Sequence, residues 1–118
     1  PILMLAESVL RGGTGATRAD ALQLVNDVRQ RAYGSTDGDI NESQLTLQFI
    51  LDERARELYW ECCRRTDLIR YGLFTGGTYK WQWKGGVADG RATESKYNIY
   101  PIPTAELSAN PNLKNENY

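Results

Sequence analysis

Glycine and proline are distributed unevenly along the 118 residues, and their positions limit the folds open to the chain. No proline occurs between Pro1 and Pro101, and three long windows before Gly72 contain no glycine. Because both residues are unfavourable inside helices, these windows are where helices are expected. After Gly72, glycine pairs at 76–77 and 85–86 indicate loops and turns. The chain is therefore predicted to be mainly α-helical, with a loop-rich C-terminal segment.

Composition and charge exclude several classes of protein. Hydrophobic residues make up 41% of the chain and charged residues 25%, which is typical of one globular unit with a modest core. The net charge of -1 gives no indication of a nucleic-acid surface. Because the chain has no histidine, it supplies no histidine base, Ser-His or Cys-His pair, or histidine metal ligand. Cys62 and Cys63 are too few for a disulfide framework, and no apolar run reaches the roughly 18 residues of a membrane span.

Apolar residues recur at helical spacing in the first two glycine-free windows. The first helix is expected to start directly after Pro1 without a cap, which we interpret as a sign that the sequence is the tail of a longer one. The second helix is expected to be capped by Thr17, with Asp20 in its first turn, and to end at Gly34. Two antiparallel helices of this size resemble one unit of a tetratricopeptide-like array. Residues 1–34 are therefore predicted to form part of an α/α superhelix.

Residues 35–45 are polar and are expected to form a turn. Asp37, Asp39 and Asn41 occupy alternate positions, as at the start of an EF-hand calcium loop. The positions that require glycine and glutamate in that loop hold other residues, so calcium is not predicted here. A solvated turn, in which such side chains bond to nearby backbone amides, explains the same pattern.

The third window, within residues 46–72, predicts a charged helix followed by a short one. Thr46 is the expected cap of a helix that continues to Cys62 with apolar residues on one face. A second, short helix is expected over residues 66–71. Both helices end before the change of composition at Gly72.

The other face of this charged helix carries acids and arginines in equal number. Two pairs, Asp52 with Arg56 and Glu61 with Arg65, stand at i,i+4 in the favourable order. We expect a structural ion network made of Asp52, Arg56, Glu61, Arg64, Arg65, Asp67 and Arg70.

Glu53 and Glu57 lie one turn apart in the same predicted helix, and two carboxylates can act as acid and base on a glycosidic bond. Neighbouring arginines would hold both carboxylates ionised, which is the opposite of what a general acid requires. The structural network is therefore the favoured interpretation, and no catalytic residue is predicted.

Nine of the twelve aromatic residues lie between Tyr59 and Tyr100. Within this stretch Tyr79, Trp81 and Trp83 alternate with polar residues, so an extended segment would project all three rings to one side. One interpretation is a carbohydrate platform, because sugar rings pack their C–H faces on flat aromatic rings. The favoured alternative is that the three rings pack onto the helices as part of the core.

Several motifs, taken together and in order, strongly resemble the SusD/RagB family. The first is the charged run 50–61 followed by 64–72. Residues 79–86 resemble the family's Trp-x-Trp-Lys-Gly-Gly segment, and residues 102–107 resemble its Ile-Pro-x-x-Glu-Leu signature. Cys62 departs from the pattern, because similar proteins usually carry glycine in the turn after the long helix.

The resemblance implies that residues 1–118 are the C-terminal part of one longer, mainly helical domain. Members of the family are surface lipoproteins of the bacterial outer membrane that capture nutrients, often glycans, for a SusC-like TonB-dependent transporter. Membrane attachment is then expected only through a lipid anchor that this sequence does not contain.

Two functions remain open for the chain at this point. In the first, the parent protein binds an oligosaccharide or polysaccharide, or a peptide as in some relatives, and Tyr79, Trp81 and Trp83 are the candidate ligand residues here. In the second, this segment, including the aromatic loops and tail of residues 73–118, is a structural or docking scaffold, and the ligand is recognised elsewhere in the parent chain. Neither function requires catalysis, a cofactor, a metal or nucleic acid, and a glycoside hydrolase is a remote alternative.

Overall fold

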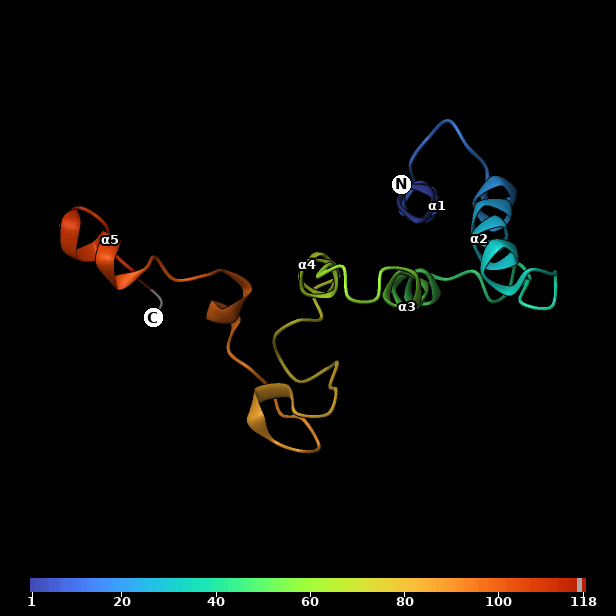
Figure 1. Ribbon diagram of the computed structural model, residues 1–118. Coiled ribbons are helices and arrows are strands. Elements are labelled where there is room, and N and C mark those ends of the chain that lie inside the picture. The colour runs from blue at the N-terminus through green and yellow to red at the C-terminus, as the bar shows by residue number, and fades with distance from the viewer. Residues whose placement is uncertain (117) are drawn as a thin grey trace. The chain divides into compact units, whose positions relative to one another are not determined.

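The computed structural model describes residues 1–116 and 118. In this part of the chain it contains five α-helices and two short 3-10 helices, and its only β pairing is an isolated bridge between Gly76 and Thr93. The mainly α-helical fold class predicted from the sequence is confirmed. The chain divides into two compact units, Pro1–Arg64 and Arg65–Tyr118, which are described separately (Figure 1).

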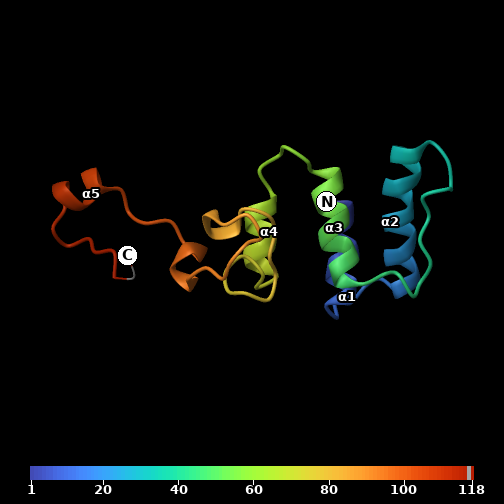
Figure 2. The same ribbon diagram turned by 90° about the horizontal axis from the view of Figure 1, so that it is seen from below.

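The first unit is built from three helices, α1 (Ile2–Leu10), α2 (Arg18–Tyr33) and α3 (Leu47–Glu57). α1 packs against α2 and also contacts α3. Figure 2 shows α3 in front of α1, with α2 beside them. The helix pair at the start of the chain is therefore completed by a third helix of the same unit.

The ends of α2 and α3 form as the sequence predicts. The Thr17 hydroxyl accepts a hydrogen bond from the Asp20 N–H, and the Asp20 carboxylate accepts one from the Thr17 N–H, which is a complete capping box. α2 ends at Gly34, whose φ of 70° lies in the left-handed region. The Thr46 hydroxyl caps α3 by accepting the Phe49 N–H at 3.0 Å.

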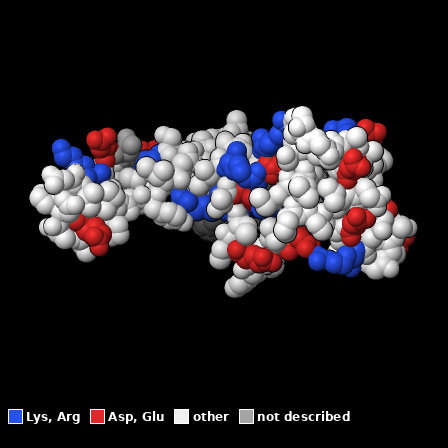
Figure 3. All heavy atoms as spheres, turned by 90° about the horizontal axis from the view of Figure 1, so that it is seen from above, with Lys and Arg blue, Asp and Glu red and all other residues white. Residues whose placement is uncertain are grey.

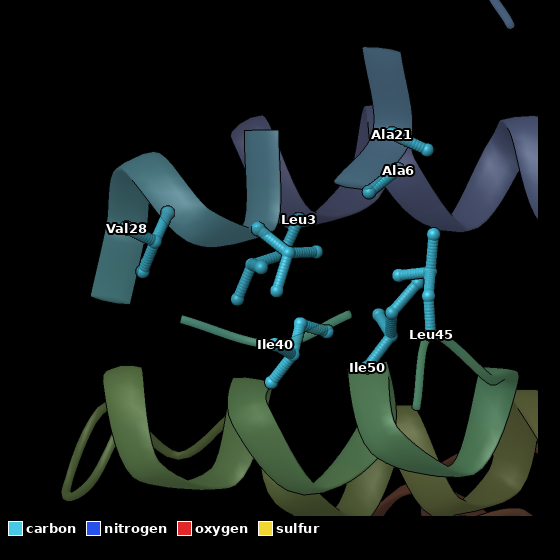
Figure 4. Close-up of a cluster of buried hydrophobic side chains, with 8 residues drawn as sticks. Leu3, Ala6, Ala21, Val28, Ile40, Leu45 and Ile50 are labelled. Carbon is cyan, nitrogen blue, oxygen red and sulfur yellow. The ribbon is translucent and has the colours of Figure 1, made fainter. Parts of the chain in front are cut away.

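The hydrophobic core of this unit lies between α1, α2 and the segment that leads into α3. In Figure 4, side chains of α1 and α2 face Ile40, Leu45 and Ile50 across a common interior. Burial of this apolar surface is the main source of stability for such a unit. The buried cluster consists of Leu3, Ala6, Ala21, Val25, Val28, Ile40, Leu45 and Ile50.

The polar segment between α2 and α3 is held by two asparagines. The Asn26 side chain accepts the Ile40 N–H at 2.9 Å and donates to the Ile40 carbonyl at 3.1 Å, which fixes the segment against α2. The Asn41 carboxamide oxygen accepts the Ser43 and Gln44 N–H groups, so the predicted Asx turn is present. No group of three or more metal-binding side chains forms among the described residues.

α3 is shorter than the sequence predicts, because it ends at Glu57 and not at Cys62. Trp60 and Cys62 have φ values of 66° and 58°, and these left-handed conformations cannot continue a right-handed helix. Glycine would adopt such a φ without steric cost, whereas cysteine adopts it only with strain. The periodic apolar pattern therefore continues past the true helix end.

The second unit has little regular structure. It contains most of α4 (Arg64–Arg70), the 3-10 helices η1 (Lys84–Gly86) and η2 (Ser95–Asn98), and α5 (Thr104–Ala109). Among its described residues, Leu68 is the one fully buried hydrophobic side chain. Within the described part of the whole chain, no helix combines the length and apolar character that crossing a membrane requires.

Candidate functional site

The second unit contains an open hollow of about 830 Å³. Its wall combines aromatic rings with cationic side chains, and we call it the aromatic hollow. The aromatic and cationic residues in its lining are Arg65, Phe74, Trp81, Lys84, Arg91, Tyr97, Tyr100 and Tyr118. Tyr97, Tyr100 and Tyr118 come from the last 22 residues of the chain, whereas Arg65 comes from α4, so segments distant in the sequence meet here.

Arg65 connects α4 to the rest of the hollow. Its guanidinium lies 3.9 Å from the centre of the Tyr100 ring and 4.9 Å from that of Phe74. The same group donates a hydrogen bond to the Tyr97 carbonyl at 2.7 Å. A planar guanidinium can stack on rings while donating in its own plane, so one side chain orders three segments.

Lys84 is the buried cation of the hollow, with 2% of its surface exposed. Its ammonium donates to the Tyr79 carbonyl at 2.5 Å and lies 4.7 Å from the centre of the Trp81 ring. Burial lowers the pKa of the Lys84 ammonium, and the nearby charge of Lys80 lowers it further. The ring of Trp81 stacks in turn on Phe74, with 6.1 Å between the ring centres.

Glycines shape the loop that carries Trp81, Lys84 and Arg91. A Cβ at Gly90 would lie 2.4 Å from the Trp81 carbonyl oxygen, so only glycine allows this close approach. The Arg91 N–H then donates to the Lys84 carbonyl at 3.0 Å. The loop thus brings its two ends together beside the hollow.

The structure places the three predicted aromatic residues differently from one another. The segment is not extended, because Trp83 has a φ of 67° and the chain turns there. Trp81, with 37% of its surface exposed, lines the hollow, whereas Trp83 is 69% exposed and is outside the lining. Tyr79 is half-buried and contacts Trp81 at 6.1 Å between ring centres. The expected one-sided row of rings is therefore wrong, and a ligand role for these residues stays a prediction.

The ion network forms with partners that differ from those expected. Arg56 bonds to Glu53 at 2.6 Å and not to Asp52, whose carboxylate instead accepts the Gln48 side-chain amide at 3.1 Å. Asp52 lies 3.6 Å from Arg64, whose guanidinium also donates to the Leu51 carbonyl at 2.8 Å.

The remaining members of the predicted network separate into two environments. Asp67 and Arg70 form an ion pair of 2.9 Å within α4, with the Asp67 carboxylate buried. Glu61 lies beyond the end of α3, so its expected i,i+4 geometry with Arg65 does not exist. The Arg65 guanidinium instead belongs to the aromatic hollow.

Glu53 and Glu57 connect α3 to α2 through ion pairs. One carboxylate oxygen of the buried Glu53 accepts hydrogen bonds from Arg29 at 2.7 Å and from Arg56 at 2.6 Å. Glu57 pairs with Arg31 of α2. These contacts are what structural ion pairs require, since each carboxylate is bonded to an arginine of the neighbouring helix.

Sequence reasoning missed the main members of the hollow. Arg65 was expected in the ion network, and Tyr97, Tyr100 and Tyr118 were not selected at all. The high density of aromatic residues up to Tyr100 was a signal for the region. This density could not identify the residues that line the hollow, because the loop turns that bring these rings together leave no periodic pattern in the sequence.

Acidic and basic side chains are interspersed on the molecular face in Figure 3, and no large area of one sign is visible. This agrees with the near balance of charge in the sequence. The chemistry concentrated in one place is instead the combination of aromatic rings and cations in the hollow. Fold and hollow together describe a mainly helical protein with an open aromatic surface suited to binding.

Comparison with known proteins identifies the family. Residues 2–118 match the family model described as SusD family, and the chain belongs to this family. It is 40% identical to the starch-binding protein SusD of Bacteroides thetaiotaomicron over 100% of this chain and 21% of that protein. It is 34% identical to the SusD-like protein P25 of Formosa agariphila over 80% of this chain and 18% of that protein. The chain thus spans about a fifth of the length of these relatives.

Proposed function

We propose that the protein containing residues 1–118 captures glycans at the bacterial cell surface, and that these residues form its C-terminal region. The observation that carries this proposal is the 40% identity, across the whole chain, to a protein named for starch binding. The aromatic hollow is consistent with it, because Trp81 and Tyr100 offer exposed ring surface of the kind on which sugars stack.

The proposal includes a partner and a place in the cell. The full-length protein is attached to the outer membrane by a lipid anchor outside residues 1–118, and it delivers its ligand to a SusC-like TonB-dependent transporter. Capture proceeds without catalysis. The two ion-paired glutamates, Glu53 and Glu57, support this point, because arginines occupy the carboxylates that a hydrolase would use.

A second candidate is that this region is a scaffold and that ligand is recognised elsewhere in the protein. The observation that favours it is on α1, where the apolar side chains of Met4 and Leu5 are 59% and 57% exposed. A helix with apolar residues on two faces is typical of stacked helical arrays, in which each helix packs between neighbours. Under this alternative, α1 packs against another part of the same protein.

The test uses the full-length protein in native gels containing soluble starch or another neutral polysaccharide. The proposal predicts retarded migration in at least one polysaccharide, without release of reducing sugar. Migration that no polysaccharide changes would contradict glycan capture. Reducing-sugar release that disappears in Glu57→Gln would support the hydrolase instead.

The scaffold alternative is tested with Trp81→Ala and Trp83→Ala in the same gels. If this region binds glycan, at least one variant migrates faster than the wild type in polysaccharide while keeping its melting temperature. If both variants keep full retention, recognition lies elsewhere. Co-purification of a TonB-dependent transporter with the tagged protein from outer membranes tests the delivery step.

A further inference from the structure

We propose that the aromatic hollow binds a saccharide unit that carries an anionic group, either a uronic acid carboxylate or a sulfate ester. The inference rests on the proposed function, because it specifies the chemical class of glycan that the same protein would capture. It follows from the charges in the lining, from the position of one arginine, from one buried lysine and from the exposed rings.

The lining of the hollow has an excess of positive charge. Arg65, Lys84 and Arg91 supply three cations, whereas Glu94 has the one acidic side chain among the described lining residues. The Glu94 side chain is 71% exposed and already lies 3.4 Å from the Lys96 ammonium. The molecular face in Figure 3 mixes both signs, so this local excess of positive charge favours an anionic ligand.

Arg91 is placed at the hollow with its guanidinium available. Its N–H is held by the Lys84 carbonyl at 3.0 Å, but its side chain makes no hydrogen bond or ion pair within the described chain. Gly85 gives it room, because a Cβ there would lie 2.7 Å from the Arg91 Cγ. A guanidinium fixed at its base and free at its tip can bind a carboxylate or a sulfate through two parallel hydrogen bonds.

Lys84 adds a buried charge that lacks a carboxylate partner in the described chain. Its ammonium carries three donors, of which the Tyr79 carbonyl accepts one, while the Trp81 ring provides a further electrostatic contact. Burial of the charged form lowers its pKa. A bound anion would restore the balance of charge at this position, since an opposite charge nearby favours the ammonium.

The rings supply the second half of the recognition. Trp81 and Tyr100 line the hollow with 37% and 75% of their surface exposed. Their faces can pack against the C–H groups of a sugar ring while the cations bind the anionic substituent. A small inorganic anion would use only the cations, so the rings favour a saccharide over a free ion.

The experiment compares three polymers with one backbone: dextran, carboxymethyl dextran and dextran sulfate. Binding of the full-length protein to each is measured by affinity gel electrophoresis at one fixed salt concentration. We expect tighter retention on at least one charged polymer than on dextran. We also expect Arg91→Gln to weaken that retention by about ten-fold or more, which is the effect of removing a charge-assisted bidentate contact.

The matched control is Lys114→Gln, which removes one positive charge from the same unit at an exposed position outside the hollow lining. Equal losses in the two variants would mean non-specific attraction and would overturn the proposal. Destabilisation by Arg91→Gln would also overturn it, because the guanidinium would then have a partner elsewhere in the protein. The carboxymethyl and sulfate polymers distinguish the two anionic groups.

The two proposals fail in different ways. If the protein is retained by starch or dextran and the charged polymers add nothing, the anionic ligand is wrong and glycan capture stands. If no polysaccharide of any charge retains the protein, glycan capture itself is wrong. If charged polymers are retained and Arg91→Gln has no effect, anionic glycans bind at a site other than the aromatic hollow.

Discussion

The two units of the chain are stabilised in different ways. In the first unit, helices enclose a cluster of apolar side chains, and a buried carboxylate, Glu53, is bonded to two guanidinium groups. In the second unit, Leu68 is the one buried hydrophobic residue among those described, and cations stacked on rings hold loops together. A unit of the second kind leaves its large rings at the surface, where they can contact a ligand.

This difference originates in the distribution of glycine. The first unit has long stretches without glycine, so its apolar residues repeat at helical spacing and are buried together. In the second unit, glycines such as Gly85 and Gly90 permit close approaches that no other residue allows. The same feature that prevents a helical core in this unit therefore builds the hollow.

The largest expected effect tests whether stability comes mainly from the first unit. Ile50 is fully buried in its core, and Ile50→Ala is expected to lower the free energy of unfolding by about 3 kcal/mol, because it leaves a cavity. Ile99 in the second unit is 57% exposed, and Ile99→Ala is expected to lower it by less than about 1 kcal/mol. Urea unfolding of the full-length protein measures both. Similar losses for the two variants would contradict the comparison.

The next effect concerns the buried ion pairs of the first unit. Glu53→Gln leaves Arg29, a mostly buried side chain, without its carboxylate, and is expected to lower the free energy of unfolding by about 2 to 3 kcal/mol. Glu42 also pairs with an arginine, Arg18, but its side chain is 70% exposed. Glu42→Gln is therefore expected to change the stability by less than about 1 kcal/mol. Thermal unfolding that gives both variants equal midpoints would show that burial of the pair has no role.

A smaller effect is expected at the link that follows α3. Cys62 has a left-handed φ of 58°, and Cys62→Gly should stabilise the protein by about 1 kcal/mol, because glycine adopts this conformation without a steric penalty. Cys63 is not among the residues with positive φ in the described chain, so Cys63→Gly should destabilise it by a similar amount. Melting temperatures of the two variants, compared with the wild type, check the expected stabilisation and the expected destabilisation. A loss of stability in Cys62→Gly would mean that the thiol, and not the backbone, determines this position.

The sequence predicted most of the first unit because its signals are local. Thr17, Gly34 and Thr46 mark helix ends through hydrogen bonds to residues only a few positions away. The end of α3 was misjudged, since the apolar pattern runs on to Cys62 while the backbone turns at Trp60. Ion-pair partners were misassigned for a related reason: spacing shows which side chains share a face, but not which of several acids an arginine bonds.

The hollow could not be predicted in the same way. Arg65 meets Tyr97 and Tyr100 only because loops of irregular length return the chain to α4. A left-handed turn at Trp83, a residue that rarely adopts it, removed the expected alternation of rings. The Lys84-Gly85-Gly86 motif is visible in the sequence, yet its role in shaping the lining of the hollow depends on contacts that no spacing records.

The smallest expected effect is on the pH dependence of stability, which should differ between the two units. Hydrogen bonds from the Thr17 N–H and hydroxyl lower the pKa of Asp20 below its usual value of 3.8. Their contribution to stability is present above that value and is lost as the pH falls through the lowered pKa. In the second unit, burial lowers the pKa of Lys84 from its usual 10.5, so the folded state holds this proton less tightly than the unfolded chain. Stability should therefore rise with pH through the window between the lowered pKa and 10.5.

Melting temperatures measured across the pH range give a curve with an acid limb, where Asp20 titrates, and an alkaline limb, where Lys84 titrates. Two variants test whether these residues produce the two limbs. Asp20→Asn should flatten the acid limb alone, and Lys84→Met, which keeps the length of the side chain, should flatten the alkaline limb alone. Asp37→Asn and Lys114→Met remove the same charges at exposed positions and should leave both limbs unchanged. An alkaline limb that survives in Lys84→Met would mean that another group produces it. Wild-type stability that falls with rising pH in this window would mean that the buried ammonium already has an anionic partner. Because the aromatic hollow is proposed to receive its anion from the ligand, that result would weigh against an unfilled site.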